Sequence, residues 1–267
     1  MIIDAHCHAG KGDGLTGPWD TDASLGAYLR RADAAGITHT VLFPVLTSDY
    51  ERANAELAAI VRAAPTRFWG FGFVHARRDR GQIARLVRAA VVDHGFVGLK
   101  VHRSDAPISR EICEAARRHR VPVLYDVTGE IAPIELVAAE YPDVAFIIPH
   151  LGSFSDDWRA QRALIDLLVR HPNVHADSAG VRRFDLLVEA VRRAGAGKLL
   201  FGSDGPWLHP GVELAKIDAL GLTSGDRDRV LAGNFLRLTA AARGVSRASR
   251  PARAPAPAVR PHATMHA

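Results

Sequence analysis

The chain has 267 residues, 48% of them hydrophobic, which is enough for one large domain with a sizeable core. Its 34 basic residues include five arginines beyond residue 242, so the preceding part balances 29 basic against 29 acidic residues. A neutral body excludes the basic face of a nucleic-acid-binding protein, and no segment is apolar enough to span a membrane.

Short β-rich runs and amphipathic runs alternate along the chain, beginning with a strand that contains Ile2 and Ile3. The pattern predicts strands at residues 2–6, 39–45, 68–74, 96–102, 121–126, 144–150, 173–178 and 198–204. It predicts helices at residues 21–36, 51–65, 80–95, 110–120, 133–142, 158–172 and 184–197. Eight strands alternating with helices over about 240 residues are typical of a (β/α)₈ barrel.

The alternative fold is a doubly wound open sheet, which would favour a glycine-rich phosphate-binding loop after the first strand. The loop at residues 9–17, AGKGDGLTG, does not match such a loop. We therefore predict a single TIM-type barrel over residues 1–242. Residues 243–267 are rich in Pro, Ala and Arg and almost without large apolar side chains, so we predict a disordered tail there.

Polar side chains stand where the predicted strands end. In the first strand, alternation turns His6 and His8 to one face and Cys7 to the other, and two imidazoles on one face suit a metal. The later strand ends carry Lys100, His102, Asp126, His150, Asp177 and Asp204. In a barrel these ends converge at one mouth, where such a ring of polar residues favours a metal or a polar substrate.

Three of these segments, DAHCH, PHLG and FGSD, resemble the metal-dependent amidohydrolase superfamily. The resemblance extends from residue 1 to about residue 242 and points to the branch that also holds aromatic-acid and aminomuconate-type decarboxylases. It implies one divalent ion, Zn²⁺ first and Mn²⁺ second, with ligands drawn from His6, His8, Asp126, His150 and Asp204. The family has a histidine where this chain has Asp126, and a carboxylate can also bind either ion.

The resemblance also implies roles for three catalytic candidates. Asp204, near the metal, can accept the proton of a water, and His150 can serve as ligand, acid or base. Lys100 either contacts a substrate carboxylate or, when carbamylated, bridges two metals. We expect Asp177 to make an internal hydrogen bond, and His75 and His102 to be pocket walls or surface residues.

The predicted function is hydrolysis of an amide, imine-type or lactone bond by a metal-activated water. The alternatives are metal-dependent, non-oxidative decarboxylation of an aromatic or related acid, and a catalytically inactive barrel that binds a ligand. The expected partner is a small molecule, and arginines and aromatic residues in the loops slightly favour an anionic or aromatic one. Two widely spaced cysteines and the lack of a leader pattern predict a cytoplasmic protein, and a homo-oligomer is compatible with the sequence.

Overall fold

A computed structural model of the chain describes residues 1–14 and 22–248, and side chains as far as residue 244. Within this part, the sheet has nine strands in the order β2-β1-β3-β4-β5-β6-β7-β8-β9. The strands are β1 (Ile3–Lys11), β2 (Asp22–Ala23), β3 (His39–Pro44), β4 (Phe68–Phe73), β5 (Gly98–His102), β6 (Val123–Asp126), β7 (Phe146–Ile148), β8 (Val174–Asp177) and β9 (Leu199–Leu200). Only β2 is antiparallel, and it pairs with the end of β1.

The sheet closes into a barrel because backbone hydrogen bonds join the segment after β9 to β1. Ala5 N–H donates to Phe201 O over 2.9 Å, and His8 N–H donates to Gly205 O over 2.7 Å. Between them, Asp204 N–H donates to His6 O over 2.8 Å. The predicted barrel is thus confirmed, although its last strand has only two residues of regular ladder.

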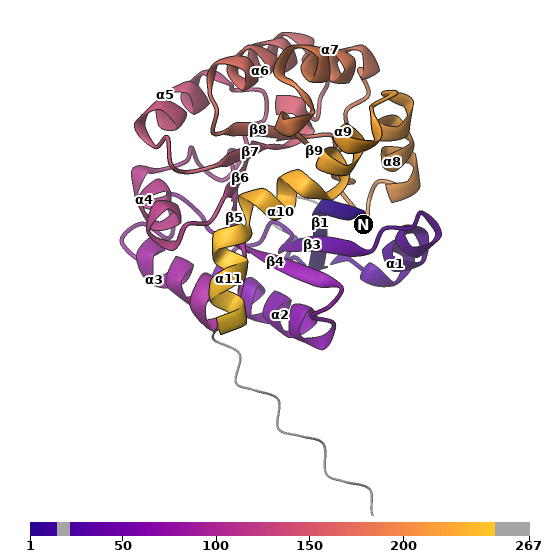
Figure 1. Cartoon of the computed structure of the whole chain (residues 1–267). Coiled ribbons are helices and arrows are strands. Elements are labelled where there is room, and N and C mark those ends of the chain that lie inside the picture. The colour runs from indigo at the N-terminus through magenta and orange to yellow at the C-terminus, as the bar shows by residue number, and fades with distance from the viewer. Residues whose placement is uncertain (15–21, 249–267) are drawn as a thin grey trace, which may run out of the picture.

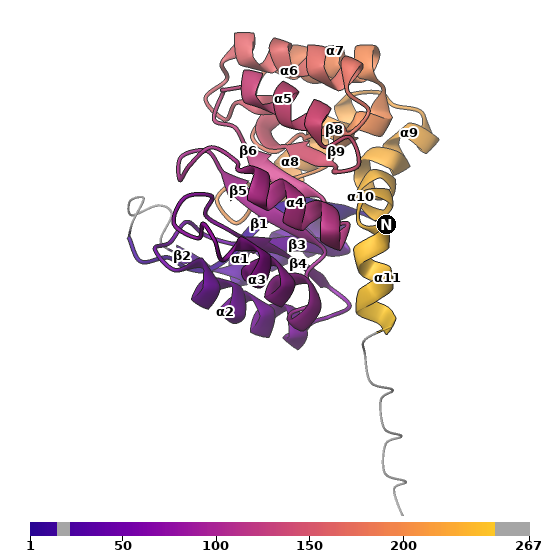
Figure 2. The same ribbon diagram turned by 90° about the vertical axis from the view of Figure 1, so that its left-hand side faces the viewer.

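Helices follow the strands and cover the outside of the barrel on all sides (Figure 1). They are α1 (Leu25–Ala34), α2 (Tyr50–Ala63), α3 (Ile83–Arg88), α4 (Arg110–His119), α5 (Ala132–Glu140), α6 (Trp158–Arg170), α7 (Phe184–Ala194), α8 (Pro210–Ala219), α9 (Ser224–Asp228), α10 (Asn234–Leu238) and α11 (Ala240–Ala248). In the turned view, α5, α6 and α7 lie on one side of the strands, and α2 and α3 lie on the other (Figure 2). No helix in the described ranges is long and apolar enough to cross a membrane.

Most helix boundaries fall within three residues of the sequence-based ones, and the exceptions have local causes. The predicted helix at 21–36 begins only at Leu25, after Asp22 and Ala23 pair with β1; residue 21 lies outside the described residues. The predicted helix at 80–95 divides into α3 and a π-helical turn, Ala89–Asp93. The tail was predicted from residue 243, but α11 continues to Ala248, and residues 249–267 lie outside the described part.

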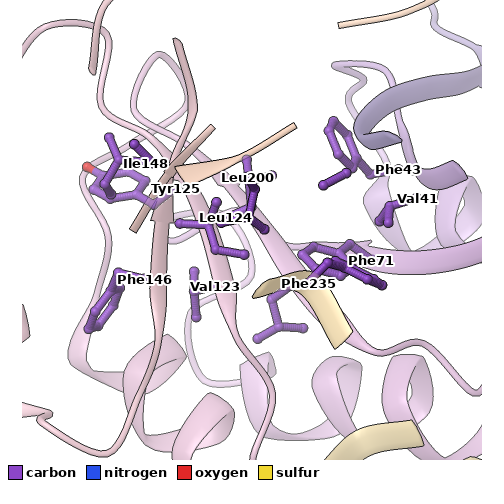
Figure 3. Close-up of a cluster of buried hydrophobic side chains, with 14 of the residues drawn as sticks. Val41, Phe43, Phe71, Val123, Leu124, Tyr125, Phe146, Ile148, Leu200 and Phe235 are labelled. Atoms are coloured by element: carbon purple, nitrogen blue, oxygen red, sulfur yellow. The ribbon is translucent and has the colours of Figure 1, made fainter. Parts of the chain in front are cut away.

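The barrel interior is filled by large side chains, which Figure 3 shows from several strands. Phe235 of α10 packs at the end of the barrel where β4 begins, with its ring 5.3 Å from that of Trp69 and 6.3 Å from that of Phe71, both in β4. Cys7 and Cys113 are both buried and free, as expected for residues that pack against the helical layer. Because the end of the barrel where the strands begin is packed, we look for a functional site at the carboxyl ends of the strands.

Candidate metal centre

Three donor atoms lie together at the mouth of the barrel. The Nε2 atoms of His6 and His8 are 3.3 Å and 3.4 Å from the same oxygen, Oδ1 of Asp204. All three side chains are buried, and their ligand atoms lie within 4.8 Å of one another. We call His6, His8 and Asp204 the donor cluster.

The other ring nitrogen of each histidine is already engaged. His6 Nδ1 lies 2.7 Å from Asp177 Oδ2, and His8 Nδ1 lies 3.2 Å from Pro44 O. Because a carboxylate and a carbonyl oxygen only accept, both imidazoles carry their hydrogen on Nδ1. Their Nε2 lone pairs therefore face a carboxylate oxygen, and His6 Nε2 is buried without a hydrogen-bond partner. A cation among these atoms would satisfy all of them, so the residues fit a divalent metal.

Protonation states suit the same interpretation. Burial lowers the pKa of His8 to about 4, so its Nε2 is free of a proton at neutral pH. Burial alone would raise the pKa of Asp204, but its contacts with His6 and His8 hold that pKa well below the usual value. At neutral pH the donor cluster thus offers the neutral imidazole of His8 and an ionised carboxylate. Burial opposes a charge on His6, but the Asp177 carboxylate raises the pKa of that imidazole, so a metal would compete with a proton for His6 Nε2.

Asp177 accepts several hydrogen bonds behind the donor cluster, in agreement with the internal hydrogen bond predicted for it. Its Oδ2 accepts from His6, and its Oδ1 accepts from the N–H groups of His150 and Ala179, each over 3.0 Å. Asp4 does the same for the other side and was missed by sequence analysis. It accepts from His6 N–H over 3.1 Å, from Tyr28 OH over 2.7 Å, and from Ser203. Its position two residues before His6 was the available signal.

His150 reaches the mouth from an unusual backbone. It follows β7 in a short turn, and both His150 and Leu151 have left-handed φ values, 59° and 49°. Asp204 is left-handed as well, with φ of 57°. Such backbone is uncommon for residues other than glycine and clusters at functional sites. His150 Nδ1 donates to Ala179 O over 2.8 Å, and its ring centre lies 4.9 Å from that of His6.

Asp126, at the end of β6, faces His150 rather than the donor cluster. Its Oδ2 is 3.5 Å from His150 Nε2 and 3.3 Å from His102 Nε2. Burial would raise the pKa of Asp126, but the two histidines hold it well below the usual value. Burial likewise opposes the charge on His150, yet the carboxylates around it, Asp126 first, raise its pKa to about 9. Asp126 and His150 therefore form an ion pair at neutral pH.

Lys100 lies on β5 with its side chain 1% exposed. Its Nζ is 4.8 Å from the ring centre of Phe43 and has no ion pair within the described part of the chain. Burial lowers the pKa of this amine, although carboxylates including Asp126 and Asp204 oppose the shift. The structure thus places an unpaired amine beside the acidic residues of the mouth.

Two aromatic rings flank the site. The ring of Trp207 lies 4.7 Å from that of His8, and the ring of Phe154 lies edge-on 5.0 Å from that of His150. Phe154 is 49% exposed, and Trp207 is half-buried. The loop arginines are mostly engaged: Arg103, Arg182 and Arg183 each pair with an acid. Of the loop residues expected to contact a substrate, the aromatic ones therefore lie at the site, whereas these three arginines are paired with acidic residues.

Solved structures with the same fold include several enzymes. The chain is 20% identical to a dihydroxybenzoic acid decarboxylase from Polaromonas sp. JS666, whose structure holds manganese and the inhibitor 2-nitroresorcinol. This match covers 90% of this chain and 96% of that one, with a TM-score of 0.70. The chain is 15% identical to 5-carboxyvanillate decarboxylase from Sphingomonas paucimobilis, over 90% and 98%, with a TM-score of 0.69. It is 16% identical to an amidohydrolase from Burkholderia multivorans with bound HEPES, over 90% and 99%, with a TM-score of 0.74.

No curated protein matches the sequence. The family described as amidohydrolase matches residues 3–238, a range that holds the whole barrel and every residue of the site. The predicted relationship is thus confirmed, and the chain belongs to the amidohydrolase family.

Proposed function

We propose that this protein is a metal-dependent enzyme that removes carbon dioxide from an aromatic carboxylic acid. The observation that carries the proposal is the position of Trp207 and Phe154, whose partly exposed rings flank the donor cluster and suit a planar ring. Solved structures of similar fold, under 25% identical, include decarboxylases of dihydroxybenzoate and carboxyvanillate, which supports this choice.

We propose one divalent ion per chain, Zn²⁺ first and Mn²⁺ second, held by Nε2 of His6, Nε2 of His8 and Oδ1 of Asp204. Three protein ligands with an open position are typical of catalytic metal sites. Such an ion supplies positive charge for the oxygens of an anionic substrate. The ligand roles predicted for Asp126 and His150 stay predictions; their ion pair favours a different task for both.

The residues of this chain then divide the chemistry. Lys100, whose Nζ has no ion pair within the described residues, offers that nitrogen to the substrate carboxylate, and the two aromatic residues hold the ring. Decarboxylation breaks the bond between the ring carbon and the carboxyl carbon, leaves the electron pair on the ring carbon and releases carbon dioxide. The ring carbon takes up one proton, and His150, which is protonated beside Asp126, is the donor in reach.

The second candidate is the predicted hydrolysis of an amide, imine-type or lactone bond, favoured by the family that the chain belongs to. In that reaction Asp204 accepts the proton of the attacking water, and His150 stabilises the developing oxyanion. The substrate is again a small molecule. Two buried, free cysteines agree with a reducing compartment, so we also propose that the protein works in the cytoplasm.

The test uses protein loaded with Zn²⁺ or with Mn²⁺ after its metal content has been measured. Carbon dioxide release is followed on a panel of hydroxybenzoates, amine or ammonia release on a panel of small amides, and proton release on a panel of lactones. We expect carbon dioxide from at least one hydroxybenzoate. Hydrolysis without decarboxylation would establish the second candidate. A folded protein that binds neither metal would refute both and leave the inactive, ligand-binding barrel.

A further inference from the structure

We propose that His102 is a positioning residue: through Asp126 it holds the imidazole of His150 in its working orientation. The inference rests on the proposed function, since it assigns a task within the same site. His102 is neither a proposed metal ligand nor a proposed catalytic residue, and the sequence predicts only that it is a pocket wall or a surface residue.

The β5–β6 ladder brings the pair together. His102 and Asp126 are direct partners in the parallel register, and Arg103 N–H donates to Asp126 O over 2.8 Å. In a sheet, partners in register present their side chains to the same face. The contact is therefore set by the backbone and not by flexible side chains.

The hydrogen on His102 can be located from its neighbours. Its Nδ1 accepts the backbone N–H of Ser104 over 3.2 Å, so the ring hydrogen is on Nε2. That atom lies 3.3 Å from Asp126 Oδ2, and the N–H of Thr128 donates to Oδ1 over 2.9 Å. Each carboxylate oxygen thus has its own donor, and the plane of the carboxylate is fixed.

The fixed carboxylate then faces His150. Asp126 Oδ2 is 3.5 Å from His150 Nε2, while His150 Nδ1 donates to Ala179 O. The Nδ1 hydrogen bond holds one edge of the ring, and the longer contact from Nε2 to the carboxylate sets the direction of the other edge while leaving the Nε2 hydrogen able to pass to a substrate. Here the aspartate is itself anchored by a second imidazole, that of His102.

His102 also has a competitor to exclude. Lys100 lies two residues earlier on the same strand, is buried, and has no ion pair within the described residues. The Asp126 carboxylate lies near enough to Lys100 to oppose the lowering of the Lys100 pKa by burial. Without the His102 donor, Asp126 is free to turn toward Lys100. That movement would release His150 and occupy the amine proposed to bind substrate.

Four variants test the inference. His102→Leu removes the donor, His102→Gln keeps an N–H donor of similar reach, and Asp126→Ala removes the carboxylate. His75→Leu is the matched control, because His75 Nδ1 also accepts backbone N–H groups of its own turn, from Arg77 and Arg78. Among the described contacts, a carboxylate, that of Asp79, accepts only from the backbone N–H of His75 and none contacts its imidazole.

The first readout is steady-state kinetics on a hydroxybenzoate that the wild type decarboxylates. We expect His102→Leu to lower kcat about 10–100-fold, less than the roughly 10²–10⁴-fold contributed by a proton-transfer side chain itself, with KM and bound metal little changed. His102→Gln should recover most of the rate and His75→Leu should resemble the wild type. His102→Leu added to Asp126→Ala should cost nothing further, because both act along one path.

The second readout does not need turnover. In protein labelled with ¹⁵N-histidine, we expect the ring-nitrogen signals of His150 to shift in His102→Leu and to return in His102→Gln. Unchanged His150 signals, or an equal loss of kcat in His75→Leu, would overturn the inference. If no hydroxybenzoate is turned over, the decarboxylase proposal fails, and the His150 signals still decide the role of His102. If His102→Leu does not fold, the comparison of His102→Gln with Asp126→Ala decides it by the same two readouts.

Discussion

Three histidines at the mouth of the barrel each have an acceptor at Nδ1 that comes from elsewhere in the chain. His6 uses Asp177, His8 uses Pro44 O, and His150 uses Ala179 O. In His6 and His8 the acceptor keeps a hydrogen on Nδ1, so Nε2 points into the mouth. The proposed ligand chemistry of these two residues therefore depends on atoms outside the donor cluster.

Asp177→Asn tests this dependence. Oδ1 of Asp177 accepts two backbone N–H groups and must remain an oxygen, so the new NH₂ group would face His6 Nδ1. His6 would then carry its hydrogen on Nε2 and lose its free lone pair. We expect metal affinity to fall about 10–100-fold, measured by competition with a chelator. Asp105→Asn, at a carboxylate that accepts from Tyr50 OH, is the control and should keep wild-type affinity.

Lys100 illustrates a conflict between stability and function at one residue. An amine that is buried without an ion pair costs free energy, and such costs persist where function needs them. Lys100→Met should therefore raise the melting temperature while lowering kcat/KM about tenfold or more, the worth of one charge-assisted hydrogen bond. Bound metal should stay at one ion per chain. A fall from two ions to one would instead reveal a carbamylated, bridging lysine.

At the scale of elements, strands β4 and β5 interlock through glycines. A Cβ atom on Gly70 would lie 2.3 Å from the ring of Phe96, and one on Gly98 would lie 2.4 Å from the ring of Phe71. The ring of Phe96 thus fills the space beside Gly70, and the ring of Phe71 fills the space beside Gly98. This explains why the segment FWGFGFV tolerates glycine within a strand, where it ordinarily weakens the sheet.

Gly98→Ala should consequently destabilise the barrel. Its methyl group cannot fit without moving Phe71, which is fully buried, and overpacking of this kind costs about 1–3 kcal/mol or more. Gly197→Ala is a fair control, because nothing lies within 4 Å of the position its Cβ would take. Urea unfolding of both variants measures the difference. Equal stability of the two would show that the β4–β5 contact yields easily.

At the scale of the whole molecule, we predict where the chain can be shortened. Arg243 donates to Thr239 Oγ1 over 3.0 Å and to Leu236 O over 2.6 Å, so the last helix is tied to the body up to that residue. Residues 249–267 are rich in Pro, Ala and Arg, and their sequence has few large apolar side chains. A chain ending at Ala248 should keep its melting temperature and turnover. Ending it at Ala242 should lower the melting temperature.

Periodicity was sufficient to predict the barrel and the convergence of His6, His8 and Asp204, because strand ends in a barrel must meet. It could not predict which residues share a hydrogen bond. The pairing of His102 with Asp126 depends on the register of β5 against β6. The approach of His150 depends on two left-handed residues in PHLG. Neither feature leaves a period in the sequence, and both decide what the site can do.

The seam of the barrel has a consequence for how the protein is made. Asp204 N–H bonds to His6 O, so the donor cluster lies where the first strand meets the segment after the last one. Ser203 and Asp4, which brace this seam, are 199 positions apart in the chain. A ribosome therefore releases the histidines long before their carboxylate partner exists. The three side chains of the donor cluster are thus present together only when nearly the whole barrel has been synthesised.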